Sequence, residues 1–201
     1  MAGVLLGVVV MAPATALERN SSKAVPRPPG HLAPRAQAFL EIARVLQSPR
    51  CQNCHPAADA PLQTDAGQPH AMLVTRGPDG RGTTSMRCSN CHMTMNNPDP
   101  HGPPGAPNWH LPPPETPMVF EGRSPDELCR TVKDPRRNGG KDLQQLVHHL
   151  TTDSLVLWGW NPGVGRTLPP LSQPEFARVV REWAEAGAPC PGDPQVTRKG
   201  T

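Results

Sequence analysis

Two copies of the pattern Cys-x-x-Cys-His constrain this chain more than any other feature of its sequence. The copies supply Cys51, Cys54 and His55, and Cys88, Cys91 and His92. Two thiols three positions apart can each form a thioether with one porphyrin, and the adjacent His then lies beneath the iron as its proximal ligand. The sequence therefore predicts two covalently bound haem c groups, one at each motif.

Three other uses of these four cysteines were weighed against haem. A zinc ribbon also has two Cys-x-x-Cys pairs, but typically about 15–20 residues apart, whereas Cys54 and Cys88 are much farther apart in the sequence. A thioredoxin-like redox pair needs a βαβ pattern around it, and the sequence has none. Simple disulfides give no reason for a His after both pairs. The haem interpretation is favoured over all three.

The two remaining cysteines, Cys129 and Cys190, have no haem to serve. In an oxidising compartment we expect them to form one disulfide, which would tie a mid-chain helix to the C-terminal region. The alternative is two separate free thiols.

The beginning of the chain indicates export. An apolar run over residues 4–11 precedes Ala14-Thr15-Ala16, a pattern typical of a signal peptide. We expect cleavage near Ala16 and a periplasmic mature protein. The run is too short to span a membrane, so no integral membrane segment is expected after cleavage. A buried N-terminal strand is the alternative.

The composition argues against nucleic acid as a partner and predicts a thin hydrophobic core. The formal net charge of +3 is small, and no basic run with interleaved aromatics is present, so nucleic acid is not an expected partner. The chain has 28 Pro and 18 Gly, with only three Phe, four Trp and no Tyr. Such a composition predicts a thin core, with two haems filling much of the interior.

The pattern along the chain predicts a mainly α fold with extensive irregular Pro/Gly-rich loops, a small dihaem cytochrome c. Apolar residues recur at helical spacing over residues 35–47 and 142–151, and Ser-x-x-Glu capping boxes begin at Ser124 and Ser172. No strand pattern alternates convincingly. The expected divisions are a signal peptide (1–16), a flexible lead segment (17–34), the dihaem domain (35–191) and a disordered tail (192–201).

Each iron needs a sixth ligand unless one site is left open. The first choices are His70, between the two motifs, and His110, in a Pro-rich loop; the reserves are His149, Met72 and Met118. Two His ligands would give a lower reduction potential, and a Met ligand would raise it.

Other side chains are expected to support the haems. The candidates for neutralising haem propionates are Arg76, Arg87 and Arg166, because guanidinium groups pair with carboxylates bidentately. The four Trp residues are expected to pack against the porphyrins: Trp109, Trp158, Trp160 and Trp183.

Beyond the two motifs, four short segments resemble a known family. They are residues 70–72 (His-Ala-Met), 76–80 (Arg-Gly-Pro-Asp-Gly), 104–111 (Pro-Gly-Ala-Pro-Asn-Trp-His-Leu) and 158–163 (Trp-Gly-Trp-Asn-Pro-Gly). Together they resemble the bacterial family of isoquinoline 1-oxidoreductase subunits, over residues 39–191. The resemblance implies a haem-bearing partner of a periplasmic molybdenum hydroxylase that oxidises N-heteroaromatics or aldehydes. The chain would then accept electrons without binding that substrate.

Two functions follow from these observations. The first is an electron-transfer protein with both irons six-coordinate, which takes electrons from a dehydrogenase and passes them to a cytochrome or an oxidase. The second is a dihaem enzyme of the peroxidase or thiosulfate-dehydrogenase type, with one open or displaceable site. The number of spare His and Met side chains favours the first, so no catalytic residues are expected.

Overall fold

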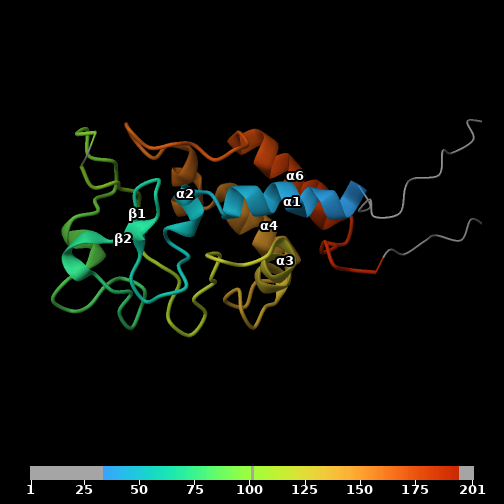
Figure 1. Ribbon diagram of the computed structural model, residues 1–201, viewed down its shortest axis with the longest axis horizontal. Helices are drawn as coiled ribbons and strands as arrows, with labels where there is room; N and C mark the ends of the chain where they lie inside the picture. The colour runs from blue at the N-terminus through green and yellow to red at the C-terminus, as the bar shows by residue number, and fades with distance from the viewer. Residues whose placement is uncertain (1–33, 101, 195–201) are drawn as a thin grey trace, which may run out of the picture. The chain divides into compact units, whose positions relative to one another are not determined.

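The computed structural model describes residues 34–100 and 102–194, and every described residue belongs to the unit formed by residues 32–201. The predicted signal peptide (1–16), nearly all of the lead segment (17–34) and residues 195–201 of the predicted tail lie outside the described residues. The elements in order are α1 (Pro34–Leu46), α2 (Pro49–Gln52), β1 (Leu62–Gln63), β2 (Gln68–Pro69), η1 (Ala71–Leu73), η2 (Cys88–Asn90), α3 (Pro125–Lys133), α4 (Leu143–Thr152), α5 (Ser154–Leu157), η3 (Trp158–Trp160) and α6 (Gln173–Glu185). The expectation of a mainly α fold is confirmed (Figure 1).

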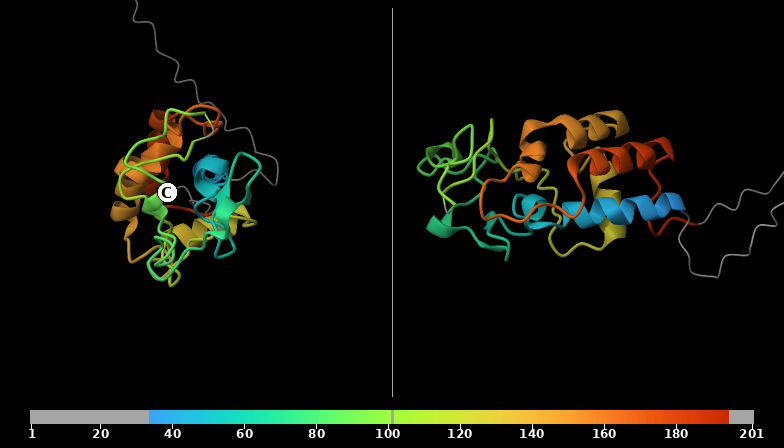
Figure 2. Two further views of the ribbon diagram at one scale, coloured as in Figure 1. Left: turned by 90° about the vertical axis from the view of Figure 1, so that its left-hand side faces the viewer. Right: turned by 90° about the horizontal axis from the view of Figure 1, so that it is seen from above.

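The four longer helices α1, α3, α4 and α6 form a bundle. Helix α1 packs against α6 and α3, and α6 also packs against α4 (Figures 1 and 2). Phe39 and Ile42 of α1 are fully buried, and the Phe39 ring lies 5.2 Å from that of Trp183 of α6. The bundle therefore has a core made of the chain's own side chains, and the expectation of a thin core is wrong for this part.

Capping boxes begin α3 and α6, as the sequence predicts. The Ser124 hydroxyl accepts from the N–H of Glu127 at 3.3 Å, and the Glu127 carboxylate accepts from the N–H of Ser124 at 2.9 Å. Ser172 and Glu175 make the same pair of bonds at 3.4 and 3.0 Å. These bonds satisfy N–H groups that a helix start leaves without partners. A third capping box, at the start of α4, was not predicted.

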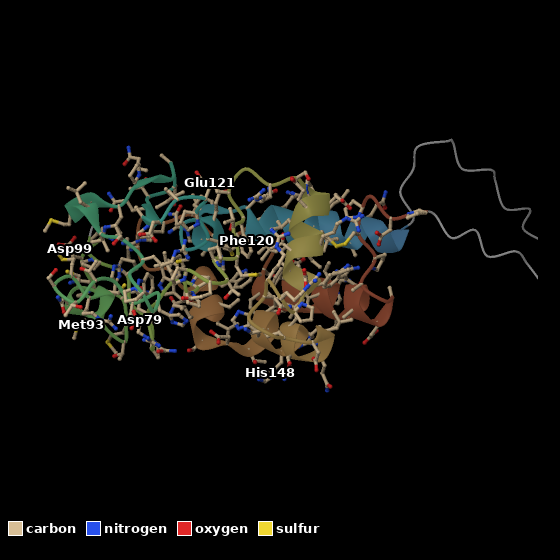
Figure 3. All side chains as sticks on the ribbon, turned by 90° about the horizontal axis from the view of Figure 1, so that it is seen from below. Asp79, Met93, Asp99, Phe120, Glu121 and His148 are labelled. Atoms are coloured by element: carbon tan, nitrogen blue, oxygen red, sulfur yellow. A yellow bond between two sulfur atoms is a disulfide. The ribbon has the colours of Figure 1, made fainter. Side chains whose placement is uncertain are left out.

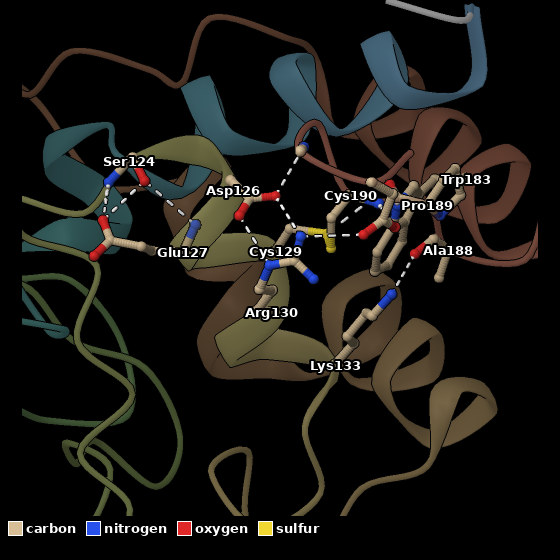
Figure 4. The surroundings of a disulfide bond; sticks show 12 residues. Ser124, Asp126, Glu127, Cys129, Arg130, Lys133, Trp183, Ala188, Pro189 and Cys190 are labelled. Carbon is tan, nitrogen blue, oxygen red and sulfur yellow. Dashed lines mark hydrogen bonds and ion pairs between the residues drawn. A yellow bond between two sulfur atoms is a disulfide. The ribbon is translucent and has the colours of Figure 1, made fainter. Parts of the chain in front are cut away.

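A disulfide joins α3 to the chain beyond α6. Cys129 and Cys190 are bonded, with their Cα atoms 5.6 Å apart, and both are fully buried (Figure 4). Next to it, Arg130 pairs with Asp126 at 2.8 Å and with Asp193 at 3.1 Å. The predicted disulfide is confirmed, and it holds the C-terminal segment against α3.

The segment between α2 and α3 is built mostly of loops. Its regular structure is the antiparallel pair β1 and β2, two residues each, with Leu62 opposite Pro69. This hairpin was not predicted, because its strands are too short to show an alternating pattern in the sequence. This segment carries the second Cys-x-x-Cys-His motif. No helix in the described part of the chain is both long and apolar enough to cross a membrane.

Candidate functional site

Each Cys-x-x-Cys-His motif is folded into one helical turn. In the first, the N–H of Cys54 donates to the carbonyl of Cys51 at 3.1 Å; in the second, the N–H of Cys91 donates to the carbonyl of Cys88 at 3.2 Å. A helical turn places residues three and four apart on one face. Each turn therefore holds its two cysteines one turn apart, with its His directly after the second, and all four thiols are free.

Both motif histidines hold Nδ1 against a backbone carbonyl. His55 Nδ1 lies 2.8 Å from the oxygen of Met118, and His92 Nδ1 lies 2.7 Å from the oxygen of Pro104. A carbonyl can only accept, so Nδ1 carries the proton and Nε2 keeps its lone pair. This is the tautomer and the fixed orientation of a metal-binding His. Met118, a reserve axial ligand in the sequence analysis, acts here through its backbone, and its side chain packs against the helical core.

An aromatic ring stacks on each of these imidazoles. The ring centroids of His55 and Phe120 are 3.9 Å apart with an interplanar angle of 11°, and those of His92 and Trp109 are 4.6 Å apart at 4°. Phe120, labelled in Figure 3, also belongs to the helical core. The stacking and the Nδ1 contact together fix each ring. The sequence analysis did not single out Phe120, because nothing local marks it as a partner of His55.

Burial changes the protonation of the motif side chains. It lowers the pKa of His55 to about 4, and it also lowers the pKa of His92. Both imidazoles are therefore neutral near pH 7 and can donate a lone pair to a metal. Burial raises the pKa of Cys51 to about 12 and that of Cys54 to about 11. These thiols are uncharged at neutral pH.

A cavity of about 590 Å³ lies beside the second motif. Cofactor sites commonly have volumes of roughly 300–1,000 Å³ and mostly apolar walls. The wall includes Cys88, Cys91, His92, Trp109, Trp158 and His70. Cys54 of the first motif also lines it, so the two motifs adjoin the same cavity. The thiols, the ligand-ready His and the aromatic wall fit a haem.

His70, the first-choice distal ligand, lies across from His92. Their ring centroids are 6.0 Å apart. Two imidazoles on opposite sides of one metal ion, each with a metal–nitrogen bond of about 2 Å, have centroids about 6 Å apart. The spacing therefore suits one iron between His70 and His92. Met72, a reserve ligand, also lines the cavity, although its side chain is 73% exposed.

His110 and His149 lie on the side of the first motif. Burial is the largest cause of the lowered pKa of His55, and the charges of His149 and His110 also lower it, so both are within electrostatic range of that ring. His110 Nδ1 is 2.5 Å from the oxygen of Asn108, and His149 Nδ1 is 3.4 Å from a carboxylate oxygen of Asp153. Each thus keeps Nε2 for a ligand. A haem iron at the first motif would have two candidate distal ligands, and one at the second motif would have His70.

Two of the three arginines proposed for haem propionates have partners within the protein. The buried Arg76 donates to the carbonyl of Pro112 at 2.7 Å and pairs with Asp59 at 3.5 Å, so it joins loops. Arg87 pairs with Asp79 at 2.7 Å. Arg166 differs, because its hydrogen-bond partners among the described residues are backbone carbonyls; like Arg87, it lines the cavity.

The expectation that all four Trp residues pack on porphyrins is wrong for two of them. Trp183 is fully buried in the helical core, and Trp160 packs on Phe176 of the same core with ring centroids 5.2 Å apart. Trp109 and Trp158 do line the cavity, edge to face at 4.9 Å.

Asn96, which the sequence analysis missed, connects the loops around the cavity. Its side-chain oxygen accepts from the indole N–H of Trp158 at 2.9 Å and from the N–H of Gly105 at 3.0 Å. Its amide donates to the carbonyl of Asn161 at 2.8 Å. A lone Asn in a turn-rich stretch gives no signal of such a role.

Within the described residues, no three His, Cys, Asp or Glu side chains form a group that could hold a metal ion. Comparison with known proteins identified no matching family model, no curated relative and no similar solved structure.

Proposed function

We propose that this chain is a dihaem c-type cytochrome that carries electrons. The observation that carries the proposal is the state of the two motif histidines. His55 and His92 each hold Nδ1 on a backbone carbonyl and leave Nε2 free, directly after a turn that contains two free cysteines. One haem c needs these three groups together.

An electron carrier is favoured over a dihaem enzyme by the surroundings of His92. When bound, each haem iron takes up and releases one electron. If a haem is bound at the second motif, the 6.0 Å spacing of the His70 and His92 rings would allow both to hold its iron, which would leave no position for a substrate. For the first iron, His110 and His149 both lie near His55. The protein's role is then to hold the irons and dock redox partners.

The location and the partners belong to the same proposal. The N-terminal pattern supports export to the periplasm, with cleavage near Ala16. The buried disulfide between Cys129 and Cys190 is in keeping with an oxidising compartment. The resemblance to isoquinoline 1-oxidoreductase subunits supports a molybdenum-containing dehydrogenase as the electron donor, with a cytochrome or an oxidase as the acceptor.

The test is a reductive titration of the mature protein, followed by carbon monoxide. We expect two electrons per chain and no carbon monoxide complex without denaturant, because both sixth positions are filled. Stoichiometric carbon monoxide or cyanide binding at one haem would overturn the carrier proposal in favour of the dihaem enzyme. Uptake of no electrons would overturn both.

A further inference from the structure

Arg50 is a buried cation in the wall of the cavity beside the second motif. It precedes Cys51 directly in α2 and is only 5% exposed. Its guanidinium pairs with Asp65, and its Nε has no hydrogen-bond partner among the described residues. Buried donors without a partner are rare because the lost hydration is not replaced. An acceptor from a ligand is therefore expected here.

Arg166 adds a second cation to the same wall. Its guanidinium donates to the carbonyls of Gly102 at 2.7 Å and Pro162 at 3.1 Å, which are neutral, and it has no ion pair within the described part of the chain. Asp65 is the one carboxylate residue of the wall, and it also accepts from the N–H of Thr167 at 3.0 Å.

The charges of the wall do not balance. Arg50 and Arg166 face one carboxylate, Asp65, while the third arginine of the wall, Arg87, is paired with Asp79. Among the described residues of the wall, one positive charge is left over, on the half-buried Arg166, beside a mostly apolar cavity. Low-dielectric sites strongly favour compensation of such a charge by an anion. The cavity thus suits a ligand that is apolar over most of its surface and carries a carboxylate.

We propose that Arg50 and Arg166 form a carboxylate site that binds a propionate of the haem attached at Cys88 and Cys91. This inference rests on the proposed function. Guanidinium groups bind carboxylates bidentately, and both the unpartnered Nε and the uncompensated charge are then satisfied. Because Arg50 adjoins Cys51, the site links the first motif to the haem of the second.

The site raises the reduction potential of that haem. Reduction adds one negative charge, which nearby cations stabilise. Removal of one unit charge at about 10 Å, with an effective dielectric constant of about 20, changes an equilibrium roughly tenfold. For a one-electron couple that is about 59 mV.

The main test variant is Arg166→Gln, because Arg166 has no ion pair among the described residues and glutamine can still donate to one of its two carbonyl partners. Arg50→Gln and Arg50→Lys follow, and Arg178→Gln is the control, since Arg178 lies on the exposed side of α6 and pairs with Glu182 at 2.8 Å. The readouts are spectroelectrochemical titration of both haems and the propionate bending bands in resonance Raman spectra.

We expect Arg166→Gln to lower one of the two midpoint potentials by the equivalent of about a tenfold change and to shift a propionate band. Arg50→Lys should keep the potential but move the band, and the control should change neither. The inference is wrong if both midpoint potentials shift by less than the equivalent of about a twofold change in the reduction equilibrium and the propionate bands do not move. The dihaem proposal would still stand. A wild-type chain without covalent haem would overturn both. Failure of Arg50→Gln to fold leaves the decision with the other two variants.

Discussion

Removal of the disulfide should lower stability by an amount that follows from its position in the chain. Cys129 and Cys190 are 61 positions apart. In the chain-entropy treatment, a cross-link over a loop of this size removes about 14 cal/mol/K from the unfolded chain, or about 4 kcal/mol at 25 °C. The proposed haem thioethers would each lie within a short motif, so they would not replace this long-range link.

The perturbation is the double variant Cys129→Ala/Cys190→Ala, with each single variant as its control. Loss of either cysteine removes the disulfide, so each single variant should lower the free energy of unfolding by nearly as much as the double variant. Urea titration followed by far-UV circular dichroism gives the free energy of unfolding. For a domain of this size, the midpoint of thermal unfolding should fall by about 8–16 °C.

Two results would refute this reasoning. The first is a double variant whose free energy of unfolding is within about 1 kcal/mol of the wild-type value. The disulfide would then contribute far less than the entropy treatment predicts. The second is additivity of the two single variants, which would indicate that each cysteine acts through its own packing. Two titratable thiols in the native oxidised protein would reject the disulfide itself.

Three other changes test separate parts of the account. Ser172→Ala removes the capping box of α6 and should cost about 1 kcal/mol in urea unfolding; no loss would mean the cap is redundant. Trp183→Ala empties a fully buried site against Phe39 and should cost about 3–5 kcal/mol, and a value below about 1 kcal/mol would contradict the core described above. His70→Ala should open one iron per chain to carbon monoxide, while His148→Ala, on an exposed part of α4, should not; carbon monoxide binding to neither variant would exclude His70 as the distal ligand.

Features that depend on local sequence were predictable. Ser124 and Ser172 begin helices because a capping box needs only residues three apart, and α1 follows from its apolar spacing. The disulfide was predictable because only Cys129 and Cys190 remained after the haem motifs were assigned. The thin core was not a correct expectation, because Phe39 and Trp183 meet from opposite ends of the sequence.

The candidate site was predictable only in its motifs. The Nδ1 contact of His55 comes from Met118, and nothing in the sequence announces a backbone carbonyl that far along the chain. In the sequence Arg50 is an ordinary charged residue before a cysteine. Its burial in the cavity wall accompanies an ion pair with Asp65, which comes from a later loop. The path of the loops between the two motifs determines these pairings, and loop paths leave no periodic signal.

The most direct test of the central claim is a pyridine haemochrome assay on the mature protein, co-expressed with the cytochrome c maturation machinery. A dihaem c-type cytochrome should show a c-type α band and two haems per chain that remain with the protein through acid–acetone extraction. Haem that is extracted, or a protein that carries zinc and no haem, would contradict it.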